Sequence, residues 1–232
     1  MPFPFRCLGL MAGLLLSLPA WAVGGTSVPL VDSLAKAAPA LDRQALEYAV
    51  SAVQCAVRHG AAPASRLAVI DYSRPSSAKR LWIFDLQRRT LLLEDYVAHG
   101  NGSGEDLASR FSNRMGSHQT SIGLFRTAES YTGRHGYSLR MDGLEPGVND
   151  LARERAIVIH GADYVDPAWI PRQGRIGRSQ GCPAVRPEVA SLVVDALKEG
   201  QFLFSWYPDR RWLSRSVFLN CDARQVASLV QP

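Results

Sequence analysis

The sequence predicts a mostly β domain with short helices, an α+β fold, preceded by one N-terminal helix. Short runs of β-branched, leucine and aromatic residues recur from residue 66 onward, and Gly- and Ser-rich loops separate them. Before residue 60, an apolar stripe at helical spacing indicates the helix. The chain has 232 residues, of which 47% are hydrophobic and 20% charged, which is typical of globular proteins and excludes disordered, fibrous and polytopic membrane classes.

Residues 1–22 are typical of an export signal. Arg6 precedes an apolar run from Leu8 to Leu18, and Ala20-Trp21-Ala22 has the small-x-small form of a cleavage site. The run is too short for a stable membrane anchor, which needs about 20 apolar residues; a buried core helix is the alternative. We therefore expect an exported protein, periplasmic or otherwise outside the cytoplasm, that starts near Val23 and is not an integral membrane protein.

Residues 23–65 are predicted to hold a linker and an accessory helix. Pro29, Pro39 and the Ala-rich patch from Ala35 to Ala40 indicate the linker. Asp42 is suited to cap a helix that closes at Gly60. Its apolar stripe comprises Leu46, Ala49, Val50, Val53 and Val57, and Cys55 lies off that stripe, on another face.

Residues 66–207 are predicted to form one β-rich domain, followed by a C-terminal segment over residues 208–232. A helix is expected from Pro187 to Lys198, with proline at its favoured first turn and Gly200 beyond its end. The expected strands are residues 67–70, 81–84, 91–97, 122–127, 137–141, 156–159 and 202–207.

The charge pattern gives no sign of nucleic-acid binding. Lys and Arg number 26 against 21 Asp and Glu, a formal net charge of +5. The basic residues are spread along the chain and form no stripe, which a nucleic-acid surface requires.

Two short motifs, twenty residues apart, have the residue types of a nucleophilic site. An apolar strand ends in His160-Gly161, and Ser179-Gln180-Gly181-Cys182 follows. A cysteine beside an imidazole is a strong nucleophile, and the N–H groups of Gly181 and Cys182 are suited to form an oxyanion hole. The alternative is a buried structural cysteine with a core histidine, which the two residues in isolation favour.

These motifs resemble the L,D-transpeptidase catalytic domain, the YkuD-like family of cell-wall enzymes with a β-sandwich catalytic domain. The segment from Thr120 to Phe125 is similar to another family motif in four positions. Over roughly residues 70–207 the chain is similar to the proteobacterial murein L,D-transpeptidase branch, at Val97-Ala98-His99-Gly100, Phe111-Ser112-Asn113, Gly177-Arg178-Ser179 and Gly181-Cys182-Pro183-Ala184. It departs from the wider family at Gln180, where that family has histidine, and at Pro183-Ala184.

The resemblance implies a cysteine acyltransferase acting on peptidoglycan stem peptides. Cys182 would attack the amide between meso-diaminopimelate and D-Ala, His160 would carry the proton, and the Gly161 carbonyl would orient the imidazole. The thioester would pass to an amine or to water, so an L,D-carboxypeptidase or a peptidoglycan–protein hydrolase stays an alternative. A non-catalytic wall-binding module is a further one. Acyl transfer of this kind needs no cofactor, and no obligate protein partner is inferred.

Arg178, Ser179 and Gln180 flank the nucleophile and are expected to bind substrate. Arg178 is suited to a two-pronged contact with a carboxylate, with a solvated arginine as the alternative. The remaining histidines lack the close, regular spacing of metal motifs, so no metal site is expected; they include His99, His118 and His135.

The cysteine count suggests a disulfide. Loss of Cys7 with the export signal leaves Cys55, Cys182 and Cys221. Since Cys182 is the expected nucleophile, we hypothesise that Cys55 and Cys221 pair in an oxidising compartment and tie the N-terminal helix to the C-terminal segment.

Overall fold

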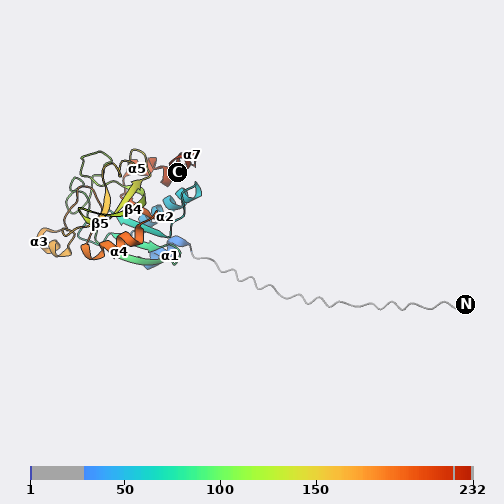
Figure 1. Ribbon diagram of the computed structural model, residues 1–232, viewed down its shortest axis with the longest axis horizontal. Coiled ribbons are helices and arrows are strands. Elements are labelled where there is room, and N and C mark those ends of the chain that lie inside the picture. The colour runs from blue at the N-terminus through green and yellow to red at the C-terminus, as the bar shows by residue number, and fades with distance from the viewer. Residues whose placement is uncertain (2–28, 222, 231–232) are drawn as a thin grey trace.

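A computed structural model describes residue 1, residues 29–221 and residues 223–230 of the chain (Figure 1). The predicted export signal therefore lies, apart from Met1, outside the described residues. The strands are β1 (Arg66–Asp71), β2 (Leu81–Asp85), β3 (Thr90–Asp95), β4 (Gly123–Gly133), β5 (Gly136–Gly143), β6 (Val158–Gly161), β7 (Ala184–Val185) and β8 (Phe202–Trp206). The helices are α1 (Leu30–Ala37), α2 (Arg43–Arg58), α3 (Ile170–Gln173), α4 (Pro187–Leu197), α5 (Arg210–Arg215), α6 (Val217–Asn220) and α7 (Ala223–Val230), with a 3₁₀ turn at Pro167–Trp169.

The strands form one continuous mixed sheet in the order β3-β2-β1-β8-β4-β5-β6-β7. β1 runs parallel to β8 and β6 runs parallel to β7, while the other neighbours are antiparallel. This confirms the mostly β fold with short helices and an N-terminal helix. The predicted β-sandwich takes the form of this one sheet, which carries an apolar layer on each of its two faces.

Alternating side chains supply these two layers. In β1, Leu67 and Val69 join one buried cluster, whereas Ala68 and Ile70 join the other. Successive side chains of a strand point to opposite faces, so a strand covered on both sides is apolar at nearly every position. This explains why the central strands appear in the sequence as continuous apolar runs.

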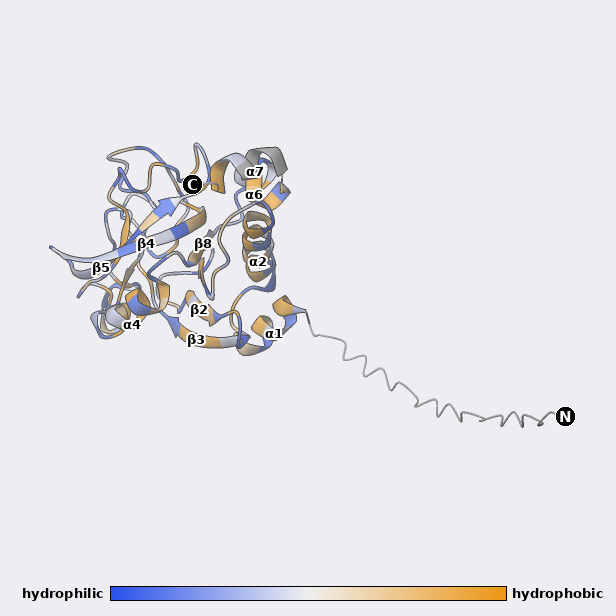
Figure 2. Ribbon diagram, turned by 45° about the vertical axis from the view of Figure 1, so that its right-hand side comes forward, coloured by the Kyte–Doolittle hydropathy of each residue, from blue (hydrophilic) through white to orange (hydrophobic). Residues whose placement is uncertain are grey.

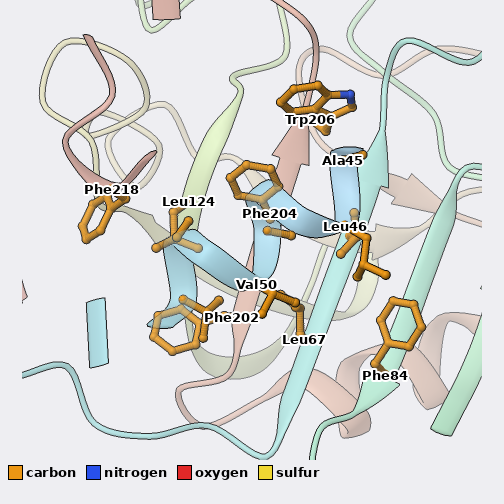
Figure 3. Close-up of a cluster of buried hydrophobic side chains, with 14 of the residues drawn as sticks. Ala45, Leu46, Val50, Leu67, Phe84, Leu124, Phe202, Phe204, Trp206 and Phe218 are labelled. Atoms are coloured by element: carbon orange, nitrogen blue, oxygen red, sulfur yellow. The ribbon is translucent and has the colours of Figure 1, made fainter. Parts of the chain in front are cut away.

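Helix α2 covers one face of the sheet and α4 covers the other. The Asp42 side chain accepts a hydrogen bond from the Ala45 N–H and caps α2 as predicted. Figure 3 shows Leu46 and Val50 of α2 among side chains of the sheet. On the opposite face, α4 buries Val193, Val194 and Leu197 against the second layer, and begins, as predicted, at Pro187.

The predicted linker contains a helix. Residues 30–37 form α1, and Leu34 is fully buried in the same cluster as α2. Proline and alanine suggested a linker, but alanine is a strong helix former, and Pro29 and Pro39 lie outside the helix interior, where proline is disfavoured. Packing of Leu34 therefore decides the conformation of this segment.

Cys55 is buried, although it lies off the predicted stripe of α2. The disulfide between Cys55 and Cys221 is present, with 5.7 Å between the Cα atoms, which confirms the hypothesised pair. Figure 2 shows α6 and α7 beside α2, so this second face of α2 is covered by C-terminal helices that the sequence pattern did not predict. The β4–β5 hairpin projects from the opposite side of the molecule.

Among the described helices, none combines the length and apolar character that a membrane crossing requires.

Candidate active site

A cavity of about 590 Å³ contains the predicted nucleophile and the predicted base. Cys182, His160, Ser179, Gln180 and Arg178 all line it. Its other lining residues come from the loop before β4, the β4–β5 hairpin, the turn before β6 and the segment after β6. The residues predicted from two separate motifs are therefore brought together.

The cavity is rich in basic side chains. No described lining residue is aspartate or glutamate, whereas six are arginine or histidine: His118, Arg134, His135, Arg155, His160 and Arg178. A cavity of this composition attracts anionic groups more strongly than neutral ones.

The end of β6 fixes the tautomer of His160. Its Nδ1 lies 2.9 Å from the carbonyl oxygen of Gly161. A carbonyl oxygen only accepts hydrogen bonds, so Nδ1 carries the proton and Nε2 keeps a free lone pair. His160 also pairs with Ala184 across the parallel strands β6 and β7. Because Ala184 is two residues after Cys182, this pairing brings His160 close to the nucleophile in the fold.

His160 is neutral at neutral pH. Burial is the main cause that lowers its pKa; the Gly161 carbonyl opposes the shift and His135 adds to it. The His135 ring, on the turn between β4 and β5, stacks on the His160 ring with 4.5 Å between centroids. His160 is therefore available as a base rather than as a cation.

The turn before the nucleophile requires glycine. Gly181 has a φ of +123°, which only glycine adopts without strain. A Cβ at this position would also lie 3.1 Å from the carbonyl oxygen of Gln119. The tight turn expected from the Gly-Cys sequence is present.

Ser179 stabilises this turn from within. Its Oγ accepts the N–H of Gly181 at 3.1 Å and donates to the carbonyl oxygen of Cys182 at 2.6 Å. The Ser179 hydroxyl, which was expected to bind substrate, thus makes its hydrogen bonds within the loop. The N–H of Gly181, one of the two expected in the oxyanion hole, is also bonded there. The N–H of Cys182 has no hydrogen-bond partner within the part of the chain described, and it stays available to an oxyanion.

The Cys182 thiol is neutral at rest. Its Sγ accepts the N–H of Val158 at 3.4 Å and donates to the carbonyl oxygen of Ala156 at 3.7 Å. Burial raises the pKa of the thiol, against smaller opposing effects of Val158 and Arg155. No hydrogen bond joins Sγ to His160 in the described structure, so the pair starts as thiol and imidazole.

Buried residues of the loop between β3 and β4 brace the nucleophile turn from behind. The Ser179 N–H donates to the His99 carbonyl at 2.9 Å, and the Thr120 hydroxyl accepts the Gly100 N–H at 2.9 Å while donating to the Gly181 carbonyl at 3.3 Å. The predicted loop at residues 100–104 therefore supports the site.

The His99 imidazole is part of this brace. Its Nδ1 accepts a hydrogen bond from the fully buried Arg80 at 2.7 Å. Burial and the Arg80 charge lower the pKa of His99 to about 3, so it stays neutral. The sequence analysis noted His99 only within a family motif and among the histidines without metal-motif spacing, and Arg80 carried no sequence signal at all.

Arg178 and Gln180 differ in their availability to a substrate. Arg178 donates to the Gly104 carbonyl at 2.7 Å and to the Glu105 carboxylate at 2.8 Å, so its guanidinium is already held. Gln180 is exposed at the cavity wall. Arg155 and Tyr164 also line the cavity, and neither lies in a motif that drew attention to it.

Comparison with known proteins gives a family and a set of distant structures. The family model described as "L,D-transpeptidase catalytic domain" matches residues 37–206. No curated protein sequence matches the chain.

Three solved L,D-transpeptidase structures match the chain at low sequence identity. An L,D-transpeptidase from Mycobacterium smegmatis is 14% identical, with coverage of 62% of this chain and 59% of that one and a TM-score of 0.39. L,D-transpeptidase 1 of Mycobacterium tuberculosis is 15% identical, with coverage of 62% of both chains and a TM-score of 0.36. An L,D-transpeptidase from Stackebrandtia nassauensis is 13% identical, with coverage of 78% and 77% and a TM-score of 0.38. The chain thus spans about three fifths of the length of the mycobacterial proteins.

Proposed function

Because the chain belongs to the L,D-transpeptidase catalytic domain family, we propose that it is a cysteine acyltransferase acting on peptidoglycan stem peptides. The observation that carries the proposal is the shared cavity of Cys182 and His160, in which the Gly161 carbonyl leaves Nε2 of the imidazole free. The basic lining of the cavity supports a substrate with carboxylates, and a stem peptide has several.

The reaction begins with proton transfer from the thiol to Nε2 of His160. The Cys182 S–H bond turns from the Ala156 carbonyl toward the imidazole, and sulfur attacks the carbonyl carbon between meso-diaminopimelate and D-Ala. The N–H of Cys182 donates to the oxyanion of the tetrahedral intermediate. As the intermediate collapses, the imidazolium gives its proton to the departing D-Ala amine and a thioester remains on Cys182.

An acceptor then releases the acyl group. Attack by a stem-peptide amine forms a new amide, which is L,D-transpeptidation, whereas attack by water gives the shortened peptide of an L,D-carboxypeptidase or hydrolase. In both cases His160 takes a proton from the attacking group and returns it to the thiolate. The chemistry needs no metal or organic cofactor.

The proposed location is outside the cytoplasm, in the periplasm or another exported compartment. The Cys55–Cys221 disulfide supports it, because such bonds persist in oxidising compartments. The predicted export signal at residues 1–22 agrees with this location.

The test is mass spectrometry of purified muropeptides after incubation with the protein. Dimers linked between two diaminopimelates indicate a transpeptidase, a tripeptide indicates a carboxypeptidase, and unchanged material refutes both. Cys182→Ala should abolish turnover and leave the fold intact, and His160→Ala should lower kcat/KM by several orders of magnitude. The double variant should be scarcely worse than either single one, because the two residues act as a unit. His59→Ala, at the remote end of α2, is the matched histidine control.

A further inference from the structure

Arg155 carries a positive charge that no carboxylate balances. Its Nη1 donates to the Ser112 carbonyl and the Ser121 hydroxyl, both at 2.6 Å, and its Nη2 donates to the Gln119 carbonyl at 2.5 Å and the Ser117 hydroxyl at 3.3 Å. All four acceptors are neutral groups of one loop. No acidic side chain pairs with Arg155 anywhere in the described structure.

Two other arginines near the site differ in this respect. Arg178 pairs with Glu105, and Arg186 pairs with Asp95. Arg155 is also half-buried, and burial lowers its pKa, so water screens its charge poorly. A half-buried charge without a counter-charge raises the free energy of the folded protein. A negative charge that forms elsewhere in the site would offset this cost.

The guanidinium lies against the nucleophile turn. Its Nη2 is 3.6 Å from the position that a Cβ on Gly181 would occupy, and Gly181 directly precedes Cys182. Arg155 and Cys182 also line the same cavity. The Arg155 charge can therefore act on the sulfur once the sulfur loses its proton.

Arg134, Arg178, His118 and His135 also line the cavity, and Arg178 is paired with Glu105. Three further titratable groups around Cys182 are neutral. They are His160 on β6, Tyr164 in the segment after β6 and Tyr72 after β1. Burial raises the pKa of both tyrosines well above the usual range and lowers that of His160. Among the described groups, Arg155 is the cation whose charge favours the thiolate of Cys182.

We propose that Arg155 is a positioning residue for the nucleophile, and that its unbalanced guanidinium stabilises the Cys182 thiolate as the sulfur proton passes to His160. The S–H bond breaks, its electron pair stays on sulfur, and the proton forms a bond to Nε2 of the imidazole. The thiol is neutral at rest and negative during attack, so the Arg155 charge lowers the free energy of the attacking state alone. The inference rests on the proposed function only in taking Cys182 as the nucleophile.

The test is the pH dependence of Cys182 alkylation by iodoacetamide, followed by mass spectrometry of the Cys182 peptide. Arg155→Gln and Arg155→Met should raise the midpoint by about one to two pH units, because each removes a unit charge from beside the nucleophile turn. Arg155→Lys keeps the charge and should stay within about half a unit of the wild-type midpoint. If Arg155 only braces the loop, Lys should behave like the neutral variants, because an ammonium cannot reproduce the four hydrogen bonds.

Arg126→Gln is the matched control. Arg126 is likewise half-buried and bonded to a carbonyl, that of Ala62, but it does not line the cavity, so its loss should leave the midpoint unchanged. A neutral Arg155 variant that is folded by circular dichroism and keeps the wild-type midpoint overturns the proposal.

Arg155→Lys supplies the deciding measurement if neither neutral variant folds. A midpoint within about half a unit of the wild-type value supports the charge role, and a midpoint raised beyond that overturns the proposal. Alkylation needs no stem peptide. A shifted midpoint in a protein inactive on muropeptides would therefore refute the proposed function and leave this inference standing.

Discussion

Removal of the Cys55–Cys221 disulfide should destabilise the fold strongly. The bond joins α2 to the end of α6 across a sequence separation of 166 residues, so the loop that it closes contains the whole sheet. The loop-entropy relation gives about 5 kcal/mol for a loop of this length at 25 °C. Residual structure in the reduced, unfolded chain lowers that value, and we expect a measured loss of about 3–5 kcal/mol.

Cys221→Ser is the variant of choice. Cys55 is fully buried, so substitution there would disturb the core, whereas Cys221 is partly exposed. Cys221 has a positive φ of 50°, and serine and cysteine adopt this conformation with similar backbone strain. The expected loss lowers the melting temperature by about 10 °C.

The measurement is urea unfolding followed by far-UV circular dichroism. Both proteins carry Cys182→Ala, so that no free thiol in the described domain can exchange with the disulfide. The parent is also measured with a phosphine reductant, which should reproduce the Cys221→Ser curve. A loss below about 1 kcal/mol on both routes would contradict the argument, because it lies below the loop-entropy range.

Two further substitutions test the site itself. His135→Ala removes the ring that stacks on His160 and the electrostatic effect of His135 that lowers the pKa of His160. The pKa of His160 should therefore rise, and the acidic limb of the kcat/KM profile should move to higher pH. An unmoved limb would exclude this role of the stacked rings. Gly100→Ala places a Cβ 2.2 Å from the His118 carbonyl oxygen and 2.8 Å from the Cα of Gly181, so this backbone must shift and kcat/KM should fall at least about tenfold. Gly147→Ala strains the backbone at a φ of +73° but its Cβ meets nothing within 4 Å, so it should keep its activity in the same assay.

The β-rich core was predictable because its signals are local. A run such as Leu67 to Ile70 is apolar at every position, which suits a strand covered on both faces. Asp42 likewise marks the start of α2 by its own side chain. These features depend on neighbouring residues in the sequence, so they can be recognised without knowledge of the fold.

Features fixed by distant contacts were missed. The alanine-rich segment before Asp42 becomes helical because Leu34 packs into the core, and Cys55 is buried because α6 and α7 reach α2 from the other end of the chain. Arg80 and Arg155 are separated from the nucleophile by many residues, and arginine is common in this sequence. Only their burial and partners distinguish them.

The candidate site shows the same division. Cys182 and His160 could be predicted because each ends a recognisable local motif, and the structure places both in one cavity. The role of Ser179 could not, because its hydroxyl points back to the turn that contains it. A residue's position beside a nucleophile thus does not decide whether its side chain faces the substrate or the loop.

The charge state of the site is consistent with a nucleophile that becomes reactive when the cavity is filled. Burial keeps Cys182 as a thiol and His160 as an imidazole, so no ion pair exists before proton transfer. A peptide with carboxylates would balance the exposed cations of the cavity wall and expel water. Arg155 is held within that wall by loop carbonyls, so its charge would then act on sulfur through a medium of lower effective dielectric constant. Filling of the cavity therefore strengthens the interaction that favours the thiolate at the moment when the substrate carbonyl is in place.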